Sequence, residues 1–102
     1  MTKFRSLDEF KRSLAEAAPP AHLSVPLASL WWMMKGDWKR AHDLVDKAEG
    51  SIEAWVHAHL HRVEGDHANA GYWYAQAGRK PVPGSLEYER EMMAKAIIEG
   101  GM

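Results

Sequence analysis

Apolar residues recur three and four positions apart along most of this chain, which is the spacing of one face of an α-helix. No segment shows the strict alternation of apolar and polar residues that is typical of a β-strand. Together with the stop signals between them, these patterns predict six helices, over residues 7–18, 25–35, 38–48, 52–64, 67–77 and 86–99. We therefore expect an all-α fold of about six helices in a single domain that covers residues 1–102.

Short polar residues stand where five of these helices begin. A serine or aspartate at the N-cap accepts a hydrogen bond from a free amide in the first helical turn. The expected N-caps are Ser6, Asp37, Ser51, Asp66 and Ser85. Glu9 completes a capping box with the first of these serines. Pro19–Pro20 then ends the first helix, because proline cannot continue the hydrogen-bond ladder.

Residues 36–48 and 65–77 carry the same pattern, Gly-Asp-x-x-x-Ala-x-x-x-(large)-x-x-Ala, at an offset of 29. Self-similarity at a fixed offset marks a structural unit that is used twice. The glycine lets one helix end tightly, and the alanine five positions later, Ala41 or Ala70, lets the next helix approach closely. The pattern predicts two equivalent helical hairpins. In the first copy the inner face is expected to comprise Trp38, Ala41, Leu44, Val45 and Ala48.

This pattern resembles the second half of a tetratricopeptide repeat, and the resemblance covers about residues 25–80 as two units. It implies two hairpins with one extra helix at each end, and a concave groove that holds extended peptides. The positions that match the lining of that groove are Pro26, Leu30 and Met33 in the first unit and Trp55, His59 and Arg62 in the second. The chain departs from the family in its offset, since the usual repeat has about 34 residues. It also lacks the Trp-x-x-Leu-Gly motif of the first helix.

The groove has two interpretations. Arg62 can stack on Trp55 and still bind a carboxylate, which suits an extended ligand. Alternatively, the first or last helix fills the groove and makes it part of the core, because two repeats alone would leave open ends. The string from Trp55 to Tyr74 also resembles a group of small bacterial proteins to which no activity is assigned.

His57 and His61 are four positions apart on the helix over residues 52–64, so both imidazoles can reach one side of it. This is the spacing of a two-histidine metal pair, with Glu64 as a candidate third ligand. A helical wheel places these three residues with Glu53 on a polar arc, which would be solvated, whereas the repeat register turns the two histidines into the interhelical packing. The metalloprotease form His-Glu-x-x-His is absent. We expect no cofactor, folding without metal, and zinc binding no tighter than micromolar.

A second polar group, Arg62, Glu64, Asp66, His67 and Asn69, surrounds the second hairpin turn. It is either a small polar site or a charged turn in water, and the aspartate is already explained as an N-cap. The candidate binding residues of the chain are therefore Trp55, His57, His59, His61, Arg62, Glu64 and Asn69. No catalytic residue stands out.

Composition excludes several classes. The 102 residues carry a formal net charge of -1 with acids and bases interspersed, which argues against nucleic acid as a partner. The chain has no cysteine and no glycine-rich phosphate loop. The longest mostly apolar run, residues 25–34, contains Pro26 and is too short to span a membrane. Since the N-terminus shows no apolar signal core, we expect a cytoplasmic protein.

Five tryptophans and six methionines are difficult to bury in one domain of this size. We expect a homodimer that buries some of Trp31, Trp32 and Met33. The predicted function is a non-enzymatic module that binds a protein segment or its own copy. The alternative is a small-molecule or metal-dependent site built on His57, His61, Arg62 and Glu64, to which the sequence assigns no ligand.

Overall fold

The computed structural model describes residues 6–81 and 83–100. Within these ranges it is all-α, without a strand, which confirms the predicted fold class. The helices are α1 (Leu7–Arg12), α2 (Val25–Met34), α3 (Trp38–Val45), α4 (Ser51–Val63), α5 (His67–Ala77) and α6 (Leu86–Gly100). No helix in the described ranges has the length and apolar character needed to cross a membrane.

The first predicted helix is shorter than expected. It is α-helical only to Arg12 and continues as a 3₁₀ turn over Ser13–Ala15. The Ser13 hydroxyl donates to the carbonyl of Phe10 at 2.6 Å and accepts from the Trp31 indole at 3.0 Å. A serine that bonds to the backbone in this way competes with regular helix.

Two other predicted boundaries are also wrong. The third helix ends at Val45, so Ala48 lies beyond it, and Leu44 is exposed rather than on the inner face. The N-cap of α4 is Gly50, whose positive φ of 127° no other residue adopts easily, and Ser51 is the first helical residue.

The two Gly-Asp turns have the same geometry, as the repeat predicted. Gly36 and Gly65 have φ values of 83° and 82°. Each following aspartate caps the next helix by accepting a hydrogen bond from the amide three residues on, at 3.0 Å for Asp37 and 3.2 Å for Asp66. The amides of both aspartates donate back across the turn in a Schellman arrangement.

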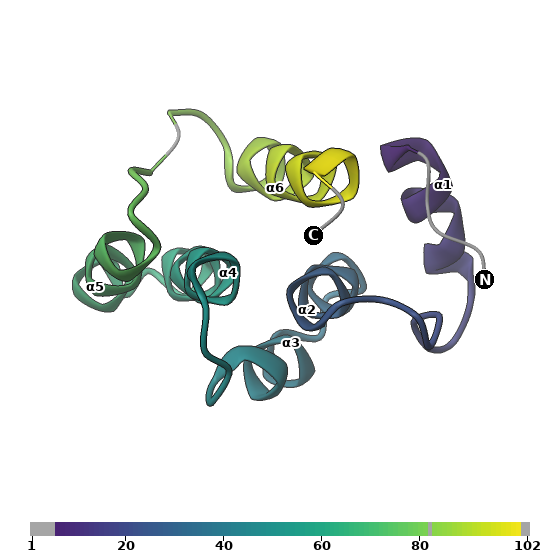
Figure 1. The fold of residues 1–102 in the computed structure, drawn as a ribbon, viewed down its shortest axis with the longest axis horizontal. Coiled ribbons are helices and arrows are strands. Elements are labelled where there is room, and N and C mark those ends of the chain that lie inside the picture. Colours follow the sequence, from purple (N-terminus) through teal and green to yellow (C-terminus); the bar gives the residue numbers. More distant parts are fainter. Residues whose placement is uncertain (1–5, 82, 101–102) are drawn as a thin grey trace.

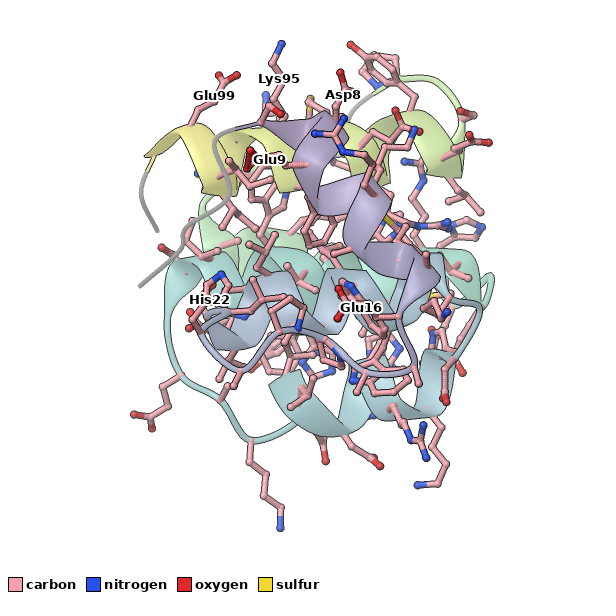
Figure 2. The ribbon with its side chains drawn as sticks, turned by 90° about the vertical axis from the view of Figure 1, so that its right-hand side faces the viewer. Asp8, Glu9, Glu16, His22, Lys95 and Glu99 are labelled. Carbon is pink, nitrogen blue, oxygen red and sulfur yellow. The ribbon has the colours of Figure 1, made fainter. Side chains whose placement is uncertain are left out.

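Figure 1 shows how the two hairpins and the flanking helices lie together. The hairpins α2–α3 and α4–α5 lie side by side, with α3 next to α4, and α6 lies over α4 and α2 on the side away from α3. In Figure 2, α1 crosses α6 and α2 from outside, and Lys95 and Glu99 project from α6 into solvent. The helices therefore surround α4.

The concave side of the hairpins is filled by α6. The predicted groove residues Pro26, Leu30 and Met33 are all buried, and α6 contributes Met93, Ala94 and Ile97, none of which is exposed. The interpretation of the groove as an open peptide site is therefore wrong for this conformation, and the alternative that a terminal helix forms core there is right.

The aromatic and methionine residues expected to be buried in a homodimer are already covered, fully or in part, within one chain. Trp31 is fully buried and Met33 is 8% exposed in the single chain. Trp32 is partly buried, with the guanidinium of Arg40 4.6 Å from its ring centroid. The large apolar residues that remain exposed in the described ranges are Val25, Leu44, Tyr72 and Tyr88.

Candidate functional site

Two groups of polar side chains lie on different sides of α4. We call the first the Glu89 cluster; its members are Glu89 of α6, His59 and Arg62 of α4, and Tyr74 of α5. The second is the histidine cluster, made of His42 of α3 with His57 and His61 of α4. Between them the two clusters include four of the seven candidate residues.

In the Glu89 cluster, one carboxylate receives three donors inside the core. The Nδ1–H of His59 donates to its Oε1 at 2.6 Å, and Nη1 of Arg62 lies 3.1 Å from the same oxygen. The Tyr74 hydroxyl donates to Oε2. Glu89 and His59 are both 0% exposed, so these contacts replace water completely.

The protonation states in this cluster follow from the hydrogen bonds. Burial raises the pKa of the Glu89 carboxyl, but the hydrogen bonds from His59 and Tyr74 and the nearby Arg62 outweigh it and lower the pKa to about 2. Burial lowers the pKa of His59, and Nε2 of that ring accepts from Nε of Arg90 at 3.2 Å. His59 is therefore neutral, with its proton on Nδ1. Burial and the adjacent carboxylate raise the pKa of Tyr74.

Two neighbouring candidate residues, Arg62 and Trp55, contact the segment between α5 and α6. Arg62 donates from Nη2 to the carbonyl of Gly84, at 2.9 Å, just before α6 begins. Trp55 is 3% exposed, and the guanidinium of Arg79 lies 3.9 Å from its ring centroid. Arg79 thus takes the place over Trp55 that the sequence analysis gave to Arg62, and the carboxylate bound by His59 and Arg62 belongs to the chain itself.

In the histidine cluster, three imidazoles converge without a buried carboxylate. Nε2 of His57 and Nε2 of His42 are 3.2 Å apart, and one ring nitrogen of each of the three histidines lies within 4.8 Å of the others. His57 is 2% exposed, so the wheel prediction of a solvated polar stripe is wrong for it and the register prediction is right. His61 is partly buried.

The remaining candidates lie around the second turn, where His61, Glu64 and Asp66 each place one nitrogen or oxygen atom within 4.8 Å of the others. Glu64 accepts a hydrogen bond from Nδ1 of His61 at 2.9 Å. Asn69 donates to Asp66 from both its backbone amide and its side chain, at 3.2 and 2.7 Å. His67 is exposed. The predicted turn group is therefore brought together in part: Glu64 and Asp66 lie close together and Asn69 bonds to Asp66, whereas Arg62 contacts Glu89.

Sequence reasoning missed His42, Glu89 and Tyr74 as members of these clusters. His42 lies four residues after Trp38 and three before Val45, so a wheel of α3 places it on the inner face. Glu89 is spaced by four and eight residues from Met93 and Ile97, which puts an acid on the apolar face of α6. Both signals were available in the printed sequence.

Comparison of this chain with protein-family models, with curated proteins and with solved structures finds no match. The resemblance to tetratricopeptide repeats stays a prediction.

Proposed function

We propose that the chain is a non-enzymatic self-association module whose two hairpins hold an acidic helix, and that two copies pair by exchanging α6. The observation that carries this proposal is the Glu89 carboxylate, which is completely buried and held by three side chains from α4 and α5. Such charge-assisted contacts give orientation as well as energy, since each donor has one favourable direction.

The rest of α6 is suited to the same role. Its inward residues Met93, Ala94 and Ile97 are fully buried, whereas Lys95 and Glu99 point into solvent (Figure 2). The helix thus has the composition of an amphipathic ligand that brings one acidic anchor. A second copy of this chain supplies that ligand by definition, which favours a second copy over an unrelated protein segment.

The connection to α6 supports exchange. Residues 79–81 and 83–85 are exposed, and they include Pro81 and Pro83. Prolines make a linker stiff, and the contacts that must be released when α6 leaves include the bond from Arg62 to the Gly84 carbonyl. Reciprocal exchange restores every α6 contact in the partner, so it requires no large exposed apolar surface. This agrees with the scattered exposed apolar residues of the single chain.

Energy transfer between labelled full-length chains tests the proposal. The sequence has no cysteine, so the exposed residues Glu49 and Lys95 can be replaced singly to carry a donor on the hairpins and an acceptor on α6. We expect energy transfer between donor-labelled and acceptor-labelled chains at high micromolar concentration. The transfer efficiency within such a pair should equal that of one chain carrying both labels, because exchange places α6 in the same position on the hairpins. A strict monomer in sedimentation, or a dimer with a different efficiency, would overturn the exchange.

The linker provides a matched pair of controls. Deleting Lys80 and Pro81, which are both exposed, should favour the dimer because α6 reaches its own hairpins less easily. Inserting a flexible Gly-Ser segment after Arg79 should favour the monomer. Equal dimer fractions in the two variants would contradict exchange through this linker, and the wild-type transfer measurement decides the question without either variant.

A further inference from the structure

We propose that His42, His57 and His61 bind one divalent transition-metal ion of the class that prefers imidazole ligands, at the junction of the two hairpins. The site is independent of α6 and of self-association. His42 comes from α3, whereas the other two histidines come from α4, so the ion would join elements that are separate in sequence.

The distances fit a shared cation. Tetrahedral zinc with Zn–N bonds of about 2.0–2.1 Å places its ligand nitrogens about 3.3 Å apart. The two Nε2 atoms of His42 and His57 are already 3.2 Å apart, and the third ring nitrogen lies within 4.8 Å of both. Little movement of the three rings is needed to surround an ion.

The ion would bind His57 through Nε2, the ring nitrogen that faces His42. Nδ1 of His57 is buried without a hydrogen-bond partner among the described residues, and its Nε2 meets only another imidazole. A neutral imidazole is the form that binds metal. A cation between the imidazoles gives this buried ring a strong polar partner.

Surrounding residues already orient the rings. The Trp38 indole stacks on His42 with centroids 4.7 Å apart, and Trp73 of α5 stacks on His57 at 4.1 Å. The Trp38 indole N–H donates to the carbonyl of Leu60 at 2.8 Å, which fixes the indole in turn. Ligands whose rotamers are held in this way lose little entropy when an ion binds.

Glu64 has a different role from the one the sequence suggested. It accepts from Nδ1 of His61, so it fixes the tautomer that leaves Nε2 of that ring with a lone pair. A carboxylate behind a metal-binding histidine is a common supporting arrangement. The sequence offered two histidines and this glutamate as ligands, whereas the structure replaces the glutamate with His42.

A carboxylate lies beside the histidine cluster. Asp46 is the nearby acid, with Oδ1 3.8 Å from Nε2 of His42 and a side chain that is 50% exposed. The fourth ligand would be that carboxylate or water. Three nitrogen ligands favour Zn²⁺, Ni²⁺ or Cu²⁺ over Mg²⁺ and Ca²⁺, which prefer oxygen.

Calorimetric titration of the full-length, metal-stripped protein with Zn²⁺ tests the site. Because His42 adds a third imidazole, we now expect tighter binding than the micromolar limit expected from the sequence: one ion per chain with a Kd below micromolar, and no binding of Mg²⁺. Replacing His42, His57 or His61 with glutamine should weaken zinc at least about tenfold in each case. His67→Gln is the matched control, since this histidine is exposed at the start of α5, and its Kd should equal that of wild type.

The His42→Gln variant carries the decisive result. Any helix with histidines four positions apart binds zinc loosely, so zinc binding by wild type no tighter than micromolar, or unchanged in His42→Gln, overturns the proposal. Circular dichroism checks that each variant is folded. If a variant does not fold, X-ray absorption of the wild-type zinc complex decides: three imidazole ligands support the site, and fewer refute it.

Discussion

His57 and His59 are separated by one residue on α4 and are both buried, yet their surroundings are opposite. His59 meets a buried carboxylate from α6 and a guanidinium from Arg90, so both of its nitrogens are paired. His57 meets an imidazole on one nitrogen and nothing on the other among the described residues. The fold completes one polar cluster internally and leaves the other incomplete.

This difference separates a structural role from a binding role. A buried polar network that is fully paired stabilises and orients its elements. A network whose members lack partners gains from a group that arrives from outside. The consequences differ in size, and substitutions on the two sides of α4 measure them.

The largest effect is expected from His59→Leu. Leucine fills much of the space of the ring but removes the Nδ1–H donor that lies 2.6 Å from the buried Glu89 carboxylate. Removing one partner of a buried charge costs about 3–5 kcal/mol, and we expect a loss of this size in the free energy of unfolding, measured with urea. His67→Leu, at an exposed histidine, should change it by less than about 0.5 kcal/mol. A small loss for His59→Leu would mean that Arg62 and Tyr74 hold the carboxylate without the imidazole.

An intermediate effect is expected from Ala70→Leu. Ala70 is 3% exposed on α5, the helix that supplies Trp73 to one cluster and Tyr74 to the other. Overpacking this contact should cost about 1–3 kcal/mol in a urea or thermal melt. Ala41→Leu, at the equivalent repeat position, should cost a similar amount, whereas Ala68→Leu on the exposed face should not. A melt unaffected by Ala70→Leu would disprove the close helix approach.

The smallest effect at neutral pH is expected from His57→Phe in metal-free protein. Phenylalanine keeps a ring against Trp73 and removes the unpaired Nδ1, while it gives up the hydrogen bond to His42. The free energy of unfolding should change by less than about 1 kcal/mol at pH 7. A loss as large as that of His59→Leu would show that the two histidines are equivalent after all.

The same variant has a sharper signature in acid. Burial in the fold lowers the pKa of His57 from 6.5 to about 4, so the unfolded chain binds the extra proton between these values. Its contribution to stability is complete above about pH 6.5 and is lost as the pH falls towards 4. We expect His57→Phe to flatten the pH dependence of stability in that range, leaving the part due to His59, whose pKa is also lowered. Equal slopes for the variant and wild type would exclude a neutral, buried His57.

Glu89 provides an internal control. Its pKa is lowered from 4.5 to about 2, so its contribution to stability is lost only below about pH 4.5, and the pH dependence in that lower range should be the same in the variant and wild type.

Local signals explain what the sequence predicted well. Gly36 and Gly65 with their capping aspartates act within one turn, so the hairpins and most helix boundaries were readable from neighbouring residues. Neighbouring residues could not show that α6 occupies the groove. Glu89 lies 30 positions from His59, and the two meet only when α6 packs against α4.

The helical-wheel prediction of the His57 orientation was wrong for a different physical reason. A helical wheel assumes one solvated face, but every residue of α4 from Ala54 to Leu60 is buried, since other helices surround it. A helix buried all round has no polar arc to find. The repeat register was the better guide for His57 because it carries information about neighbours in space.

The packing position of α1 has a consequence for the order in which the chain folds. Its buried Phe10 and its ion pair from Lys11 to Glu91, at 3.1 Å, place it against a surface that includes α6. The two hairpins form from neighbouring segments and can close early, whereas α6 must return from the far end of the chain before α1 has its complete seat. We therefore expect hierarchical assembly, in which α1 is among the last elements to become native.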